Sequence, residues 1–130
     1  TREARQLVQA TTPAGLGAAD AIAYRATIRV YVTLDVHQFG QTDAHYFPEE
    51  NVRFTRLSEP KNYFRDSLEP EGVTVLCAEV PCSMDEPLWS MSDEELGAMV
   101  LKDMQTAGIP APVAPRAVHS RRLKQAYPIY

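Results

Sequence analysis

Long apolar runs and an excess of positive charge are both missing from this chain of 130 residues. No stretch approaches the ~20 apolar residues of a membrane-spanning helix, so we expect no membrane span. The formal net charge is -4, whereas binding to nucleic-acid phosphates needs a concentrated positive field. We therefore expect no nucleic acid among its partners.

Cysteine and histidine are scarce, with two and three copies. Cys77 and Cys82 stand in CAEVPC without a second cysteine pair or a nearby histidine, which argues against a structural zinc site. We expect one buried strand thiol and one loop thiol, in a reducing, cytoplasmic compartment. The histidines are scattered and carry no local nucleophile pattern.

A glycine-rich phosphate loop is missing as well. Gly15 and Gly17 form a GLG sequence, but no strand precedes it and the pattern does not continue. The chain therefore has no dinucleotide-binding fingerprint of its own.

Alternation of apolar and polar residues predicts the clearest strand over 26–35. Its apolar face consists of Ile28, Val30, Val32 and Leu34. Arg29 and Tyr31 lie two apart on the other face, close enough to line one groove. We expect that second face to border a cleft or a second layer.

Further strands follow at 44–47, 52–58 and 73–80. The first two form a hairpin around PEEN. The third is nearly all apolar, which is typical of a central strand, and Pro81 is expected to end it.

One helix begins at the capping box SDEE from Ser92 and ends near Gly108. Its buried stripe is predicted to be Leu96, Met99, Val100 and Met104. Residues 117–126 are ambiguous, and we favour a strand; residues 1–9 and 18–24 favour short helical turns. The predicted fold is α+β, an antiparallel-rich mixed sheet of about four or five strands covered by one main helix.

The stretch FTRLSEPKNYF holds the best candidate site. If 52–58 alternates, Phe54 and Arg56 share a face, and a guanidinium beside an aromatic ring can bind an anion or a ring. Alternatively, Arg56 pairs with Glu59 or an aspartate and only closes the strand end. Tyr127 and Tyr130 in AYPIY either present hydroxyls to a ligand or pack in the core.

Several segments, in order, resemble the substrate domain of FAD-dependent oxidoreductases. They are YRATIRVYVTLD, DAHYFPEENVRFTRLSEPKNYF, VTVLCAEVPC, SDEEL and RRLKQAYPIY. The group includes flavin amine oxidases, protoporphyrinogen oxidase-like proteins and UDP-galactopyranose mutases. FTRLSEPKNYF is similar to the Thr-Arg-Ile-x-Glu-x-Lys stretch of the mutases.

This resemblance implies that residues 1–130 are a substrate-binding domain within a longer FAD-binding chain, roofing the flavin ring and not catalytic alone. FAD would be bound by the other domain, which would be the partner of this one, together with a small-molecule substrate. Arg56 and Glu59 would face the cavity, Arg29 and Tyr31 would form part of its wall, and Tyr127 would lie where the chain returns to the FAD domain. In the isolated fragment, an apolar face that the FAD domain normally covers would be open to self-association.

Two other functions stay open at this point. One is a UDP-galactopyranose mutase-like isomerase domain, and the other is a non-enzymatic protein-interaction module that uses the uncovered sheet face.

Overall fold

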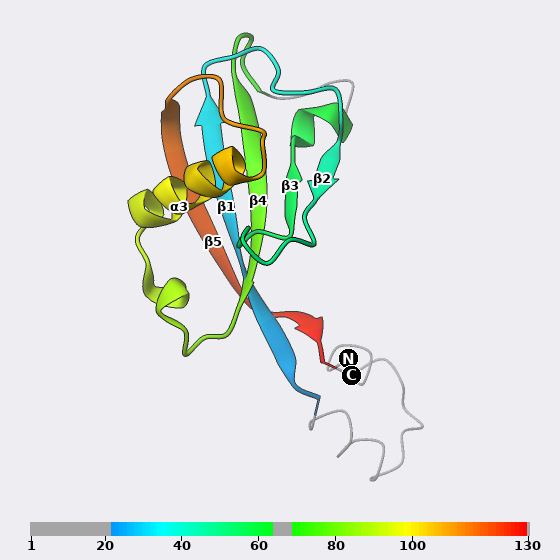
Figure 1. The fold of residues 1–130 in the computed structure, drawn as a ribbon, viewed down its shortest axis with the longest axis vertical. Helices are drawn as coiled ribbons and strands as arrows, with labels where there is room; N and C mark the ends of the chain where they lie inside the picture. Colours follow the sequence, from blue (N-terminus) through cyan, green and yellow to red (C-terminus); the bar gives the residue numbers. More distant parts are fainter. Residues whose placement is uncertain (1–21, 64–68, 130) are drawn as a thin grey trace.

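Five antiparallel strands form one sheet in the computed structural model, which describes residues 22–63 and 69–129. In spatial order they are β2 (Ala44–Tyr46), β3 (Arg56–Ser58), β4 (Thr74–Cys82), β1 (Tyr24–Leu34) and β5 (Pro115–Pro128). Helix α3 (Asp93–Thr106) crosses one face (Figure 1). Two 3-10 turns, η1 (Pro60–Tyr63) and η2 (Pro87–Ser90), lie in the connections. The α+β class is confirmed, with β4 central as predicted; the described pairings are all antiparallel, so the sheet is not mixed there.

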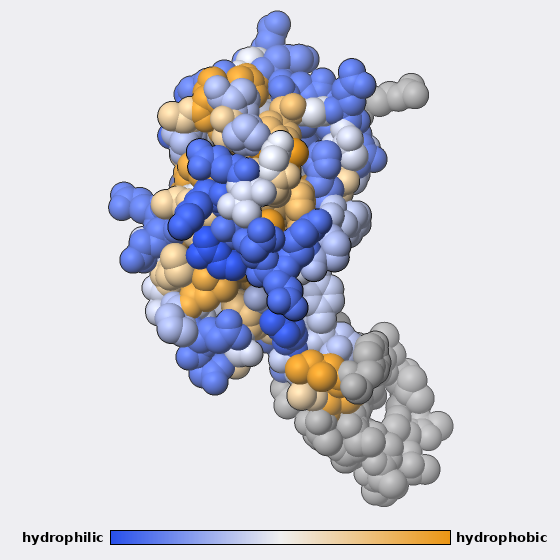
Figure 2. Space-filling view, viewed as in Figure 1, coloured by the Kyte–Doolittle hydropathy of each residue, from blue (hydrophilic) through white to orange (hydrophobic). Residues whose placement is uncertain are grey.

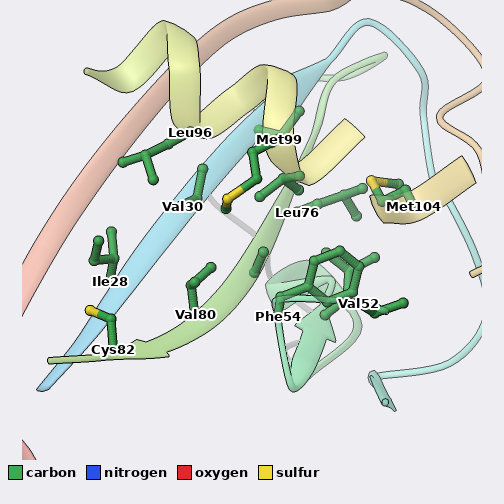
Figure 3. Close-up of a cluster of buried hydrophobic side chains, with 14 of the residues drawn as sticks. Ile28, Val30, Val52, Phe54, Leu76, Val80, Cys82, Leu96, Met99 and Met104 are labelled. Atoms are coloured by element: carbon green, nitrogen blue, oxygen red, sulfur yellow. The ribbon is translucent and has the colours of Figure 1, made fainter. Parts of the chain in front are cut away.

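The core lies between α3 and the sheet. Every second residue of β1 from Ala26 to Leu34 is at most 2% exposed, because side chains alternate between the faces of a strand. Figure 3 shows Leu96 and Met99 of α3 pointing toward Val30 of β1. The predicted helical stripe is confirmed, since all four of its residues are buried.

The ends of α3 follow the predicted signals. The Glu95 N–H donates to Ser92 Oγ at 3.2 Å, and the Ser92 N–H donates to Glu95 Oε2 at 2.7 Å, which is a full capping box. Beyond Thr106, Gly108 adopts a φ of 76°, a left-handed conformation that glycine reaches without strain. Local sequence signals therefore define both ends of the helix.

The prediction of a strand over 52–58 is only partly correct. Pairing is confined to Arg56–Ser58, and both Thr55 and Arg56 lie opposite Glu79: the Thr55 N–H donates to the Glu79 carbonyl at 2.9 Å. Two residues against one is the arrangement of a β-bulge, which shifts the alternation by one residue. Phe54 is consequently in the core, edge-to-face with Phe47, and does not share a face with Arg56 as predicted.

Pro81 does not end β4, which runs through to Cys82. The Glu79 carbonyl points toward β3, so the nitrogen of Pro81, two residues later, points the same way, beyond the end of β3. Proline has no backbone N–H, but this costs no strand hydrogen bond at Pro81, because β3 does not extend that far. Cys82 is accordingly a buried strand residue and not the predicted loop thiol; both cysteines are free and buried.

The first and last described segments lie side by side. Tyr24 pairs with Pro128, and the Ile129 N–H donates to the Ala23 carbonyl at 2.8 Å. Tyr24 thus begins a strand and does not end a helix as predicted. Residues 117–126 form a strand, as predicted. The predicted turns at 1–9 and 18–21, together with the GLG sequence and Tyr130, lie outside the described residues.

The outer surface of α3 is largely hydrophilic, with separate apolar patches around it (Figure 2). Within the part of the chain that the structure describes, no helix is long and apolar enough to cross a membrane. Among the same residues, no group of three or more His, Cys, Asp and Glu side chains is arranged to hold a metal ion.

Candidate functional site

The sheet face turned away from α3 carries a continuous line of polar side chains. The strand register places Arg56 opposite Tyr46, Glu79 opposite both Arg56 and Arg29, and Arg121 opposite Arg29. Residues directly opposite each other in antiparallel strands project from the same face. We call these five residues, Tyr46, Arg56, Glu79, Arg29 and Arg121, the polar row. It crosses all five strands at one level.

Glu79 lies at the centre of the polar row and joins side chains from three other strands. Its Oε1 lies 3.2 Å from Arg56 Nη1 and 3.8 Å from Arg29 Nη2, and its Oε2 accepts from the Tyr127 hydroxyl at 3.1 Å. The Glu79 side chain is only 10% exposed, although no other layer of the described structure covers this face. The surrounding arginine and tyrosine side chains therefore shield it, and a shielded carboxylate pairs more strongly than an exposed one.

Arg56 is held on several sides. Its Nη2 donates to the Tyr63 hydroxyl, and its guanidinium carbon lies 5.8 Å from the Tyr46 ring centroid and 5.9 Å from that of Tyr63. Both distances are within cation–π range. The ion pair that we considered between Arg56 and Glu59 is wrong, because the carboxylate partner of Arg56 is Glu79.

The electrostatics of this face favour binding over proton transfer. Burial, and then the negative charge of Glu79, raise the pKa of Tyr127, so its hydroxyl remains a donor at neutral pH. Burial and the same carboxylate raise the pKa of Cys77, which keeps the thiol protonated. Burial lowers the pKa of Arg56, but the Tyr63 hydroxyl and Glu79 more than offset this, and the net shift is upward.

Glu59 lies away from the polar row, buried at 2% exposure. Its Oε1 accepts from the Phe39 N–H at 2.8 Å and from the Thr74 hydroxyl at 2.5 Å, and its Oε2 accepts from the Gly40 N–H at 2.9 Å and from Asn62 Nδ2 at 3.3 Å. Four donors saturate both carboxylate oxygens. Glu59 thus fixes the 37–43 loop to β4, and its contact with a substrate stays a prediction.

Lys61 and Asn62 hold the same loop. Lys61 Nζ donates to the carbonyls of His37 and Val73, both at 2.6 Å. Asn62 Nδ2 donates to the carbonyls of Gly40 and Thr42 at 3.0 and 3.1 Å. The polar density of SEPKN therefore reflects loop anchoring, and of the longer stretch FTRLSEPKNYF only Arg56 belongs to the polar row.

Of the five predicted site residues, the structure brings together Arg29, Arg56 and Tyr127 around Glu79. Tyr31 lies on the same face two residues along, opposite Cys77 and His119. Sequence reasoning missed Glu79 and Arg121. A single charge inside the otherwise apolar VTVLCAEV was a signal for Glu79, whereas Arg121 needed the register of a strand whose type was ambiguous.

Two cavities lie away from the polar row. One, of about 540 Å³, is lined by Ile22, Tyr24, Met84, Lys124 and Gln125 at the paired ends of β1 and β5. Another, of about 430 Å³, lies between the end of α3 and the start of β5. Neither of these cavities is lined by a residue of the polar row.

Neither protein-family models nor curated proteins give a match to this sequence. The solved structures that share its fold include the following two. A reduced UDP-galactopyranose mutase superposes with a TM-score of 0.68 at 22% identity, over 86% of this chain and 24% of that one. A putative protoporphyrinogen oxidase from Exiguobacterium sp. 255-15 superposes with a TM-score of 0.69 at 25% identity, over 97% of this chain and 28% of that one. The chain spans about a quarter of the length of each neighbour, and what it shares with them is the fold of that quarter.

Proposed function

We propose that this chain is the substrate-binding domain of a flavin-dependent oxidoreductase, and that the polar row forms the wall of a cavity over the FAD isoalloxazine. The observation that carries the proposal is the polar row, a shielded ionic cluster on an uncovered sheet face. The fold that presents it is shared with a UDP-galactopyranose mutase and a putative protoporphyrinogen oxidase. Small-molecule sites commonly lie at domain interfaces, so a second domain placed against this face would form one with the polar row as its wall.

The geometry of the paired ends supports a place inside a longer chain. Ala23 and Ile129 are joined by a backbone hydrogen bond, so the polypeptide enters and leaves the sheet at one point. Adjacent ends are what domain insertion requires, because the host domain is then little disturbed. Ile22, Met84 and Ile129 are 38%, 54% and 58% exposed, and their apolar surface fits a contact with a neighbouring domain.

The residues of this chain suit one part of a flavin site only. Arg29 offers donors, and the exposed rings of Tyr46, Tyr63 and Tyr127 offer flat surfaces, to a ring and its substrate. No glycine-rich phosphate cradle is present in the sequence, so the proposal assigns the FAD pyrophosphate to another domain. When bound, FAD would supply the redox chemistry, while this chain would bind and orient the substrate and exclude water.

A mutase-like isomerase domain is the second form of the same proposal. It is favoured by the similar superposition of the UDP-galactopyranose mutase. Both forms use the same wall. In the oxidoreductase form the substrate undergoes net oxidation, whereas in the isomerase form its oxidation state does not change.

The test compares the 130-residue chain with the complete product of its gene, each purified without added flavin. We expect the chain to be colourless and the complete product to carry stoichiometric FAD, seen by its visible absorbance. A complete product that stays colourless after incubation with FAD would sink the proposal, and a specific protein partner on the polar row would then favour the interaction module. The chain alone should also self-associate more than the complete product, measured by sedimentation.

A further inference from the structure

The far end of the polar row carries two arginines. Arg29 and Arg121 are directly opposite each other on β1 and β5. Like charges in this position repel, and a sheet normally avoids them or places an opposite charge between them. Here the carboxylate of the polar row, Glu79, lies beyond Arg29, on the side away from Arg121.

Neither of these arginines is saturated with acceptors. Arg29 is 43% exposed and approaches Glu79 only at 3.8 Å, an ion-pair distance without a hydrogen bond. Its Nε is buried and has no hydrogen-bond partner in the described structure. Arg121 is exposed, and its side chain makes no ion pair or hydrogen bond with the described residues. Arg56 Nε is likewise buried without a partner, but the Arg56 guanidinium donates to both Glu79 and Tyr63.

We infer that Arg29 and Arg121 form a binding site for an oxyanion group carrying two charges, such as a phosphate ester, a diphosphate or a dicarboxylate. Two guanidinium groups on neighbouring strands can each give parallel N–H donors to such a group, and its charge removes their mutual repulsion. The site is built from this chain alone. That the oxyanion belongs to the substrate rests on the proposed function, and Arg56 then has the separate task of supporting the wall.

The same geometry predicts an unusual relation between stability and binding. Removing Arg121 relieves repulsion and breaks no contact within the described residues, so the Arg121→Gln variant should fold and melt at the same temperature as the wild type, or higher. An added oxyanion should raise the melting temperature of the wild type, because a ligand that binds only the folded state stabilises it.

The experiment titrates the 130-residue chain, without flavin, with inorganic pyrophosphate and separately with malonate at constant ionic strength, by calorimetry. The variants are Arg29→Gln, Arg121→Gln and, as the matched control, Arg116→Gln. Arg116 is on the same strand and its loss changes the charge equally, but it pairs with Asp35 at an exposed position. The melting temperature of each variant checks its fold.

We expect saturable binding to the wild type, weakened about tenfold or more by either row substitution and changed less than about twofold in the control. Pyrophosphate binding more tightly than malonate assigns a phosphate-type group, and the reverse assigns carboxylates. Absence of saturable binding, or an equal loss in the Arg116→Gln control, would overturn the inference, because the attraction would then be diffuse. Flavin plays no part in this assay, so its outcome is independent of whether the complete gene product binds FAD.

Discussion

Replacing Glu79 probes the organisation of the polar row. In Glu79→Ala, Arg56 loses a hydrogen bond to a charged group, worth about 1.5–3 kcal/mol. The half-exposed Arg29 loses an ion pair worth up to about 1 kcal/mol. Tyr127 loses its acceptor as well, so we expect a total near 3 kcal/mol, since such contacts are not additive. Glu79→Gln keeps the shape and one acceptor oxygen, and should cost about 1–2 kcal/mol.

The assay is urea unfolding at neutral pH, followed by circular dichroism. Glu71→Gln is the control, because Glu71 is exposed and the substitution changes the charge equally; it should stay within about 0.5 kcal/mol of the wild type. If Glu79→Gln were as stable as this control, the carboxylate charge would not hold the row together. The reasoning would also be refuted if the Arg56 and Arg29 side chains kept the same fixed positions in Glu79→Gln.

Three further substitutions test the framework beneath the row. Gly97→Ala places a Cβ 2.7 Å from Val118 Cγ2 and should destabilise the fold by about 1–2 kcal/mol. In a Val118→Ala background the same substitution should stabilise the fold, because alanine has a higher helix propensity than glycine. A change of the same sign in both backgrounds would contradict this packing. Burial raises the pKa of Asp103, but hydrogen bonds from Arg53 outweigh this, and the net shift is downward. Asp103 therefore stabilises the fold above the unfolded pKa of about 3.9, and this stabilisation is lost as the pH falls through the folded pKa. Asp103→Asn should accordingly reduce the loss of unfolding free energy at acid pH. Glu59→Gln replaces one carboxylate oxygen by an NH2 group that faces two of the four donors, and it should cost about 2 kcal/mol, with faster hydrogen exchange at the Phe39 amide; unchanged exchange there would contradict the anchoring role.

Periodicity predicted much of this fold because most of the sheet obeys it. The β1 alternation, the α3 capping box and the central position of β4 all depend on neighbours in sequence, and all are found in the structure. The bulge at Thr55 and Arg56 could not be predicted in this way, because it depends on which residue of β4 lies opposite. One extra residue there moved Phe54 to the core and changed the surroundings expected for Arg56.

The candidate site was harder to predict than the fold for the same reason. Arg56, Glu79, Arg29 and Arg121 are far apart in sequence and meet only through the register of four strands. Local density pointed instead to SEPKN, where polar side chains crowd because one loop needs many hydrogen-bond partners. A high density of polar residues near a strand end therefore does not distinguish residues that anchor a loop from residues that bind a ligand.

If the complete gene product binds FAD as we propose, the reduction potential of that flavin tests the central claim most directly. If the polar row faces the isoalloxazine, Arg29→Gln should lower the potential, because a nearby positive charge stabilises the negative charge of the reduced ring. Arg116→Gln, with the same change in charge at the far end of β5, should leave it unchanged. Equal potentials for both variants and the wild type would contradict the account, because the row would then lie away from the flavin.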